Sequence, residues 1–318
     1  MLFILTNAED ATASFLVDRL SKNQVPFLRL DTDTLISKTE VSYRAQKPAL
    51  KVDGTLYRPE DVDHIWYRRP EKLKTSIGKT SPEVEYTIQE WSEALEGFFA
   101  HIPKKDWVNY PAYNAAASHK LEQLTTASRL GFKIPDTLVT QDPNALRDFF
   151  DRNRGRVIVK PMASGYVERS LESYDSLIYT NPVTEQHLDN LADLPACPTM
   201  FQQYIRKQFD VRITVIDAHI HPVALADYEE DGTARCDIRR NNMKDVVYQR
   251  IELPSLIIAK IRHLVSHYKL RFAAIDMAVD LNGEWHFFEI NPNGQWAWLE
   301  ICADVKISDS FLDSFKRV

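Results

Sequence analysis

Residues 272–296 read FAAIDMAVDLNGEWHFFEINPNGQW, with two apolar runs on either side of Asn282-Gly283. An Asn-Gly pair between alternating apolar residues is a strong hairpin signal, because the type I′ turn needs a positive φ at both central positions. A two-residue turn fixes the register of the strands, so Asp276 is expected directly across from Glu289. Asn291 lies two residues beyond Glu289 and therefore on the same face. The opposite face is expected in the core, with Ile275, Met277, Val279 and Leu281 on the first strand and His286, Phe288 and Ile290 on the second.

Two carboxylates that face each other on adjacent strands repel, so a fold that half-buries them needs a compensating positive charge. Carboxylate and amide oxygens are hard ligands, and the set Asp276, Glu289 and Asn291 suits Mg²⁺ that carries nucleotide phosphates. The alternative is a solvated acidic hairpin without a role. The clean separation of polar and apolar faces, with an Asn-Pro-Asn-Gly turn directly after it, favours the metal site.

The composition predicts a globular protein of more than one domain. The chain has 318 residues, of which 44% are hydrophobic, and a formal net charge of −6. A net acidic chain argues against a general nucleic-acid-binding protein, which needs a basic face. No apolar run approaches the ~20 residues of a membrane-spanning helix, so no membrane association is expected. Three widely spaced cysteines, Cys197, Cys236 and Cys302, indicate no disulfide framework and favour a reducing cytoplasm.

The first hundred residues predict an α/β unit. A strand, a helix and a second strand follow one another, which favours a parallel sheet with a right-handed crossover. The expected elements are strands over 2–6, 26–30 and 64–67, a helix over 11–24, a meander over 41–57, and a long helix with the apolar stripe Val84, Ile88, Trp91, Leu95, Phe98 and Ile102. Pro103-Lys104-Lys105-Asp106 marks a boundary.

The rest of the chain predicts two further units with mixed helices and strands. The expected elements are helices over 118–130, 143–152, 184–194 and 254–269, strands over 134–140, 156–160, 200–205, 210–216 and 221–227, the hairpin described above, and a C-terminal helix. His219 with His221, and His263 with His267, lack further ligands nearby in sequence, so neither pair predicts a zinc site.

The order Asp276, then Glu289-x-Asn291, resembles the metal-binding signature of ATP-grasp ligases. The longer run 289–296, EINPNGQW, with Trp298-Leu299-Glu300 after it, resembles the graspetide synthetases, the microviridin-type enzymes that cyclise ribosomal peptides. The resemblance implies an α/β fold, with α+β character in the C-terminal part. It divides the chain into a pre-ATP-grasp domain (1–105), a central subdomain (106–198) and a C-terminal subdomain (199–318).

The resemblance also implies residues that bind ATP and act on it. Lys120 and Lys160 would hold phosphates, and the segment 162–166, with Ser164, would be the phosphate lid. Gln202, Gln203, Tyr204 and Ile205 would form the adenine-binding segment, although many ATP-grasp enzymes have glutamate where Gln202 stands. Asp210 would meet the ribose. Arg212 and Arg239 would act on the transferred phosphate as catalytic residues, and Asp276, Glu289 and Asn291 would hold Mg²⁺.

Tyr67-Arg68-Arg69-Pro70 resembles an element of the pre-ATP-grasp domain of the same enzymes. The residues alone predict an exposed strand end that carries two guanidinium groups. These groups could bind a carboxylate or phosphate bidentately. The alternative is that they form interdomain salt bridges to the long helix.

The implied activity is ATP-dependent activation of a carboxylate through an acyl phosphate. The expected partner is a precursor peptide with a leader and a core that contains acidic side chains and hydroxyl or lysine side chains, which the enzyme would join as esters or amides. The enzyme would be cytoplasmic, with a homodimer as one option. A ligase that adds an amino acid or small amine to a carboxylate is one alternative. A non-catalytic ATP-binding module is another, against which the intact set Arg212, Asp276, Glu289 and Asn291 argues.

Overall fold

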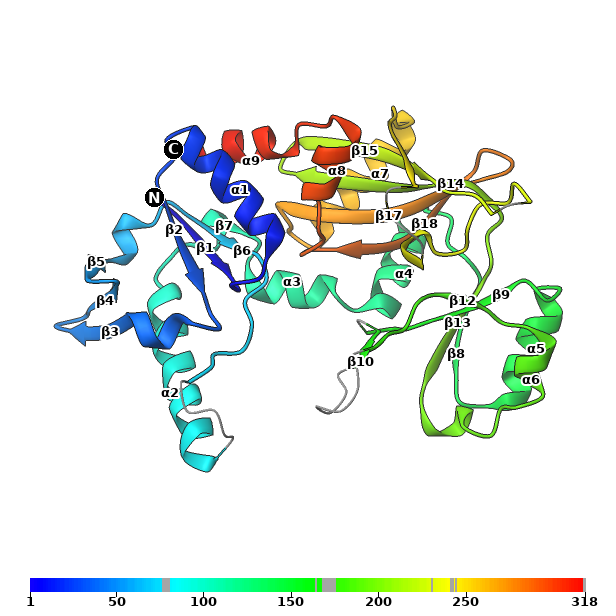
Figure 1. The fold of residues 1–318 in the computed structure, drawn as a ribbon, viewed down its shortest axis with the longest axis horizontal. Helices are drawn as coiled ribbons and strands as arrows, with labels where there is room; N and C mark the ends of the chain where they lie inside the picture. Colours follow the sequence, from blue (N-terminus) through cyan, green and yellow to red (C-terminus); the bar gives the residue numbers. More distant parts are fainter. Residues whose placement is uncertain are drawn as a thin grey trace.

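The computed structural model describes residues 1–75, 81–163, 165–167, 176–229, 231–240, 243 and 245–316. Three sheets organise these residues, and two smaller strand groups accompany them. Figure 1 shows the N-terminal sheet at one end of the molecule, the C-terminal sheet beside it, and the central sheet below the C-terminal one. None of the described helices is both long and apolar enough to cross a membrane.

The N-terminal sheet has the order β2-β1-β6-β7 and is parallel throughout, as the β-α-β pattern predicts. Asp10 caps the first helix, because its side chain accepts hydrogen bonds from the backbone N–H groups of Thr12 and Ala13. Ser81 caps the long helix in the same way, with Pro82 in its first turn. The elements are β1 (Leu2–Thr6), α1 (Ala11–Lys22), β2 (Phe27–Asp31), β6 (His64–Tyr67), α2 (Pro82–Phe99) and β7 (Trp107–Val108), with the meander β3 (Thr39–Arg44), β4 (Lys47–Val52) and β5 (Thr55–Tyr57) and short 3₁₀ helices at Leu35–Lys38, Pro59–Asp61 and Lys104–Asp106.

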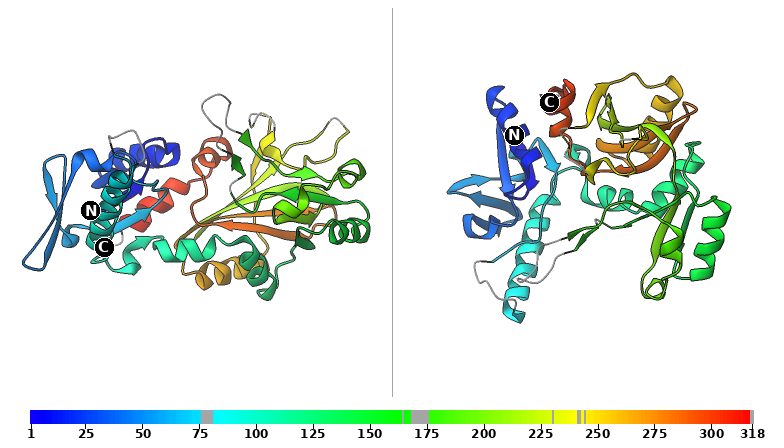
Figure 2. Two further views of the ribbon diagram at one scale, coloured as in Figure 1. Left: turned by 90° about the horizontal axis from the view of Figure 1, so that it is seen from below. Right: turned by 45° about the vertical axis from the view of Figure 1, so that its right-hand side comes forward.

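The central sheet is antiparallel, with the order β12-β9-β13-β8, and α5 covers one face. Two helices, α3 and α4, lead into it (Figure 2). The helix predicted over 118–130 is confirmed as α4, but the prediction missed the short helix before it, which begins at Pro111 and includes Ala115–Ala117. The elements are α3 (Pro111–Ala117), α4 (Lys120–Arg129), β8 (Thr137–Thr140), α5 (Pro143–Arg152), β9 (Val157–Lys160), β10 (Tyr166–Val167), β11 (Ser176–Leu177), β12 (Asn181–Pro182), α6 (Glu185–Leu188), a 3₁₀ helix (Leu194–Ala196) and β13 (Thr199–Gln203).

The C-terminal sheet is antiparallel, with the order β16-β15-β14-β17-β18. Helix α7 packs on one face, and α1, α8 and α9 share a hydrophobic cluster with the other. This second cluster joins the N-terminal and C-terminal parts of the chain into one body. The elements are β14 (Lys207–Ile216), β15 (His219–Ala226), a 3₁₀ helix (Ile238–Arg240), β16 (Val247–Arg250), α7 (Ser255–His267), β17 (Phe272–Asp280), β18 (Trp285–Asn291), α8 (Ala297–Ala303) and α9 (Ile307–Lys316).

The hairpin of β17 and β18 forms as predicted, but its turn does not. Asp280 N–H donates to the Glu284 carbonyl, and Gly283 N–H donates to the Asp280 carbonyl, so the loop has three residues. Of the Asn-Gly pair, Gly283 alone has a positive φ, at +82°. Leu281 is consequently 61% exposed and not in the core.

A bulge after Asp276 restores the predicted register. Met277 pairs with Phe287, one residue away from the partner that a two-residue turn requires, whereas Asp276 still pairs with Glu289. The bulge therefore exchanges the roles of two aromatic residues. Phe287 is fully buried and Phe288 only partly, the reverse of the prediction.

Candidate functional site

A row of charged side chains crosses three neighbouring strands of the C-terminal sheet. Arg212 of β14 pairs in register with Asp276 of β17, which in turn pairs with Glu289 of β18. Directly paired residues on antiparallel strands share a face, so the predicted opposition of the two carboxylates is confirmed. Arg212 Nη1 donates to both carboxylate oxygens of Asp276, at 2.8 and 2.7 Å. Arg212 therefore supplies one of the positive charges that compensate the two carboxylates.

Two lysines from other parts of the chain lie on Glu289. Lys120, the first residue of α4, donates a hydrogen bond to its carboxylate, and Lys160 Nζ, at the end of β9, lies 4.0 Å from it. Gln123 fixes α4 here, since its side chain bonds both the N–H and the carbonyl of Ile290, at 3.1 and 2.8 Å. The fold thus brings both predicted phosphate-binding lysines to the predicted metal-binding carboxylates.

Burial and charge shift the acid–base equilibria of this cluster in different directions. Burial raises the pKa of Asp276, and the negative charge of Glu289 acts in the same direction while Arg212 opposes it. Burial alone would also raise the pKa of Glu289, but Lys160 and Lys120 outweigh it and lower that pKa to about 2. Burial lowers the pKa of Lys160, against the influence of Glu289. These charges are largely removed from water, so the pKa of each group depends on the charges of the others.

Asp210 lies two residues before Arg212 on β14, and Lys207 holds it. Lys207 Nζ donates to both Asp210 carboxylate oxygens, at 2.8 and 2.6 Å, and to the Cys236 carbonyl at 3.2 Å. Burial raises the pKa of Asp210, with Lys207 opposing the shift. Sequence reasoning missed Lys207, although its spacing of three from Asp210 is visible. The contact to the Cys236 carbonyl joins β14 to the segment that carries Arg239.

Arg239 lies at the rim of the cluster, with 60% of its side chain exposed. Its guanidinium binds Asp237 bidentately, with Nε–Oδ1 at 2.9 Å and Nη2–Oδ2 at 2.6 Å. This bond raises the pKa of Arg239, and the charges of Glu289 and Asp276 act in the same direction. The direct partner of Arg239 is therefore Asp237, and the charges of Glu289 and Asp276 also act on its guanidinium.

The predicted adenine-binding segment begins in β13 and continues beyond it. Gln202 is buried and its amide donates to Thr137 Oγ1 at 2.9 Å, so its side chain braces the central sheet. Tyr204 and Ile205 follow the end of the strand, and the Tyr204 N–H donates to the Arg156 carbonyl at 2.9 Å. Ser164 lies outside the described residues. Beside it, Gly165 has a φ of +73°, and a Cβ there would lie 2.7 Å from the Ile178 carbonyl oxygen.

The prediction of an exposed strand end with two guanidinium groups is wrong for Arg68. Arg68 is fully buried, and it pairs with Asp10 at 3.2 Å and not with the long helix. Its Nη1 and Nη2 groups bind the loop that follows β18. Arg69 is exposed and donates to the Asn293 carbonyl at 3.2 Å. Sequence could not separate these neighbours, because their burial depends on residues far along the chain.

The donor set of Asp276, Glu289 and Asn291 fits Mg²⁺. Two carboxylates and an amide offer only oxygen, the ligand type that this ion prefers. The carboxylates already attract three cationic side chains, so the position favours positive charge. Asn291 Oδ1 accepts from the Asn293 N–H at 2.9 Å, which fixes its side chain at the end of β18.

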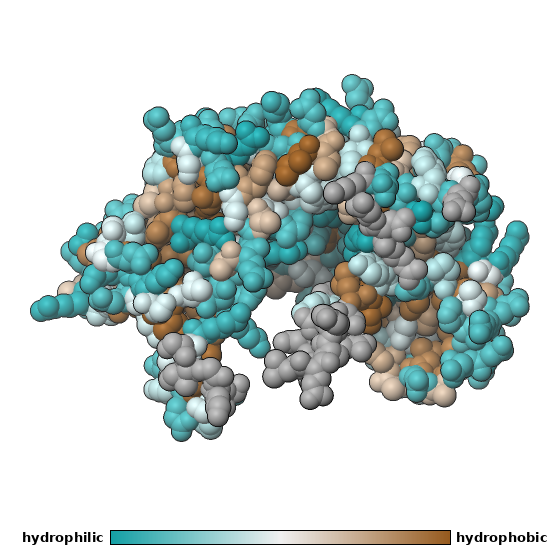
Figure 3. Space-filling model, in the orientation of Figure 1, coloured by the Kyte–Doolittle hydropathy of each residue, from teal (hydrophilic) through white to brown (hydrophobic). Residues whose placement is uncertain are grey.

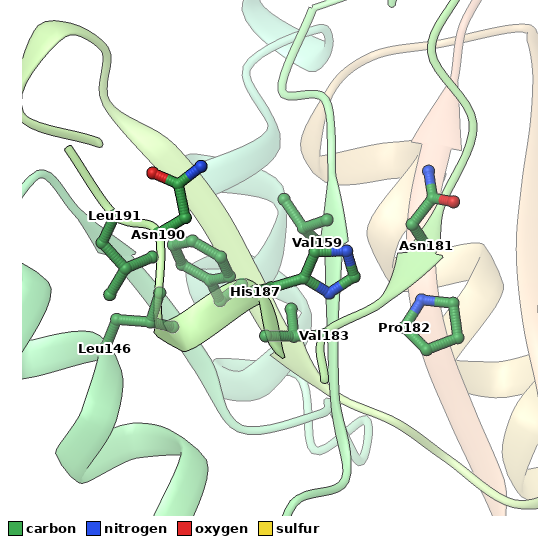
Figure 4. Close-up of a pocket in the computed structure, with 9 residues that line it drawn as sticks. Leu146, Val159, Asn181, Pro182, Val183, His187, Asn190 and Leu191 are labelled. Atoms are coloured by element: carbon green, nitrogen blue, oxygen red, sulfur yellow. The ribbon is translucent and has the colours of Figure 1, made fainter. Parts of the chain in front are cut away.

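Two other features of the described residues do not belong to this cluster. Asp280, Glu284 and His286 bring ligand atoms within 4.8 Å of one another at the hairpin tip, but Asp280 already bonds His286, and Lys133 pairs with Glu284. A cavity of about 350 Å³ lies between α6 and the central sheet (Figure 4). It is lined by Val159, whose side chain points away from the face that carries Lys160.

The surface has a hollow beneath the C-terminal sheet (Figure 3). Figure 3 shows the molecule hollowed below the C-terminal sheet, between the N-terminal part and the central sheet, with hydrophilic side chains on the wall beneath the C-terminal sheet. The charged row and the two lysines come from the elements around this hollow.

Solved structures share this architecture over nearly their whole length. The chain is similar to macrocyclase MdnC from Microcystis aeruginosa MRC, bound with precursor peptide MdnA, with a TM-score of 0.84, 25% identity, and coverage of 100% of this chain and 99% of that chain. It is also similar to a Chryseobacterium gregarium RiPP-associated ATP-grasp ligase in complex with ADP and a leader and core peptide. The TM-score is 0.84 at 26% identity, with coverage of 99% of this chain and 96% of that chain. A third similar structure is macrocyclase MdnB from Microcystis aeruginosa MRC, with a TM-score of 0.78, 27% identity, and coverage of 100% of this chain and 99% of that chain.

The family comparison agrees with these structures. None of the curated proteins gives a significant match. The model of the prokaryotic glutathione synthetase ATP-grasp domain matches residues 122–285, slightly more than half of the chain, including Lys160, Arg212 and Asp276. The chain therefore belongs to this ATP-grasp family, and it is an ATP-dependent ligase.

Proposed function

We propose that the protein uses ATP to activate acidic side chains of a ribosomally made precursor peptide and joins them to hydroxyl or amine side chains of the same peptide. The observation that carries the proposal is the end-to-end likeness to a macrocyclase bound with its precursor peptide and to a ligase bound with a leader and core peptide. Each joined pair would close a ring through an ester or amide bond.

The charged cluster supplies the groups that such a reaction needs. Asp276, Glu289 and Asn291 would hold Mg²⁺, and the bound ion would neutralise phosphate charge as the phosphoryl group is transferred. Lys120 and Lys160 would bind the phosphates, in exchange for their present contacts with Glu289. The adenosine would lie along the segment Gln202, Gln203, Tyr204 and Ile205, with its ribose at Asp210 and the lid near Ser164.

The catalytic contribution of the chain is then positioning and charge neutralisation. A peptide carboxylate attacks the γ-phosphorus of ATP, and the bond from this phosphorus to the oxygen of the β-phosphate breaks. ADP departs, and the peptide then carries an acyl phosphate. A hydroxyl or amine attacks the acyl carbon, loses a proton and expels inorganic phosphate. Arg212 and Arg239 present guanidinium groups to the negative charge in both steps, so no nucleophile of the protein is needed.

Arg69 completes the binding surface for an acidic substrate. It is exposed, and both the desolvation of its guanidinium and the charge of Arg212 lower its pKa, while Asp10 opposes them. Arg69, Arg212 and Arg239 would form a local positive pocket in a protein of net charge −6. Such a pocket selects acidic side chains.

The remaining assignments are part of the same proposal. The domains span 1–105, 106–198 and 199–318, and a homodimer is an option for the assembly. Cys197, Cys236 and Cys302 are all thiols, as expected for a reducing cytoplasm.

The test is mass spectrometry of a candidate precursor peptide, encoded beside this protein, after incubation with ATP and Mg²⁺. Loss of one water from the peptide for each ADP released supports ring formation. A gain in peptide mass, or release of AMP, assigns a different ligase chemistry. Absence of any ADP release identifies a non-catalytic ATP-binding module, and the Glu289→Gln variant is the matched inactive control.

A further inference from the structure

A buried arginine connects the N-terminal sheet to the charged row. Arg68, the residue after β6, is 0% exposed, and its Nε lies 3.2 Å from Asp10 Oδ2. Asp10 also accepts from Thr6 Oγ1 at 2.8 Å and caps α1. Asp10 therefore balances the charge of the guanidinium inside the N-terminal part of the fold. The terminal N–H groups of Arg68 can bind other residues.

Both terminal nitrogens of the guanidinium bind residues 293–295, here called the 293–295 loop. Nη1 donates to the carbonyl of Asn293 and, at 3.1 Å, to that of Gly294, while Nη2 donates to Gln295 Oε1 at 2.7 Å. This loop directly follows the strand that carries Glu289 and Asn291. Arg68 thus fixes the chain immediately after the proposed metal ligands.

The 293–295 loop in turn supports Arg212. The Gln295 carbonyl accepts from Arg212 Nη2 at 3.2 Å, and a Cβ on Gly294 would lie 2.6 Å from the same nitrogen. Arg212 Nε is buried, and the described residues offer it no hydrogen-bond partner. The guanidinium therefore depends on Asp276 and on this loop for its orientation. Once Asp276 serves a cation, the Gln295 carbonyl is the contact that remains.

We infer that Arg68 is a positioning residue of the ligase site, which holds the 293–295 loop so that Arg212 faces the transferred phosphate. The inference rests on the proposed role of Arg212. A different role is that Arg68 only joins two parts of the fold. Arg19 offers the matched comparison, since its Nη2 bonds Glu300 at 3.2 Å and joins α1 to α8 without a contact to the loop.

The test uses Arg68→Lys, Gln295→Leu and the control Arg19→Met. Lysine keeps a charge beside Asp10 but lacks the fork that reaches three acceptors. Calorimetry in Mg²⁺ should show that Arg68→Lys weakens a non-hydrolysable ATP analogue about ten- to a hundredfold, the effect of about one charge-assisted hydrogen bond. Binding of ADP, which lacks the transferred phosphate, should stay within about twofold.

Gln295→Leu should shift the ATP analogue in the same direction, and the double variant should fall short of the sum of the two effects, because both act through one contact network. Arg19→Met should change neither affinity. Equal weakening of ADP and the ATP analogue, or the same result for Arg68→Lys and Arg19→Met, overturns the inference. The pair with Asp10 is retained in Gln295→Leu, so this variant decides the question even if Arg68→Lys does not fold.

Nucleotide affinity requires no peptide, so these results do not depend on the peptide chemistry. If the wild-type protein modifies no peptide, the proposed function fails while the nucleotide comparison still holds. If the nucleotide comparison fails while the peptide loses water, Arg68 is structural and the proposed function holds.

Discussion

At the residue scale, the site consists of charges that stabilise one another. Repulsion between Asp276 and Glu289 taken alone would make removal of one carboxylate stabilising. The lysines reverse this sign, because Lys120 and Lys160 lower the pKa of Glu289 to about 2. A carboxyl whose pKa is depressed in the folded state stabilises that state while it is ionised.

Glu289→Gln should therefore nearly abolish ATP turnover and also lower the free energy of unfolding by about 1–3 kcal/mol, since two buried ammonium groups lose their partner. Urea unfolding and ADP release measure the two effects. Glu284→Gln, which removes an exposed partner of Lys133 at the hairpin tip, is the control and should leave turnover unchanged. A more stable variant would mean that carboxylate repulsion outweighs the lysines.

The stability difference between wild type and Glu289→Gln should depend on pH. The Glu289 contribution is complete above its ordinary pKa of 4.5 and is lost as pH falls toward about 2, where the folded state takes up the proton. Unfolding curves between pH 7 and pH 2.5 should therefore converge at the acid end. Asp276, whose pKa is raised in part by Glu289, has the opposite sign: its penalty at neutral pH is smaller in Glu289→Gln, and it also vanishes at the acid end, so the convergence remains. A difference that stays constant with pH contradicts the ion-pair account.

Lys160→Met should weaken nucleotide binding by about ten- to a hundredfold, the effect of one hydrogen bond to a charged group. Methionine keeps the buried stem and removes both the burial cost of the Lys160 charge and its attraction to Glu289, so the free energy of unfolding should change little. Calorimetry with ADP and a thermal melt test both statements. Unchanged affinity would assign Lys160 a structural role, and Lys133→Met, on an exposed lysine, provides the control.

At the element scale, the hairpin shows what the sequence predicts and what it does not. Alternation and Asn-Gly predict two strands and the opposition of Asp276 and Glu289. They do not predict the three-residue loop, because Asp280 accepts from the N–H groups of Asn282 and Glu284 and so stabilises another turn. They also miss β16, an edge strand with no clear alternation, whose partner β15 lies more than twenty residues earlier.

The two glycines of this region should respond differently to alanine. Gly283 has a φ of +82° but open space around it, so Gly283→Ala should cost about 1–2 kcal/mol of stability and leave ligase activity intact. Gly294 has no positive φ, but its Cβ would lie 2.3 Å from the Ala274 Cβ. Gly294→Ala should therefore displace Arg212 and abolish activity. Thermal melts and ADP release separate the two, and an active Gly294→Ala contradicts the tight packing.

At the scale of the whole molecule, the site is assembled from parts that are far apart in the chain. Lys120, Lys160 and the charged row belong to different sheets or their flanking helices, and sequence motifs identify each of them singly. Arg68 shows the limit of such motifs. Its burial follows from Asp10 and from the 293–295 loop, which lie about sixty and over two hundred residues away.

The charge distribution of the whole molecule makes a last prediction about substrate binding. The protein has a net charge of −6, so an acidic peptide is repelled at long range and attracted only by the local pocket of Arg69, Arg212 and Arg239. Arg69 contacts neither Asp276 nor Glu289, and Arg68 also bonds the Asn293 carbonyl that Arg69 reaches, so Arg69→Ala should raise the KM for peptide about three- to thirtyfold and leave the KM for ATP unchanged. Arg44→Ala, on an exposed arginine of the meander, is the control.

Salt distinguishes this effect from a general loss of structure. Screening shortens the range of an exposed charge from ~10 Å at 0.1 M to ~3 Å at 1 M, so the KM of wild type should rise with salt. The KM of Arg69→Ala should rise less, and the two proteins should become more alike at high salt. Initial rates of peptide dehydration, measured by mass spectrometry from 0.05 to 0.5 M salt, follow this convergence. Parallel salt curves for the two proteins would exclude Arg69 from peptide binding, because its contribution would then not be electrostatic.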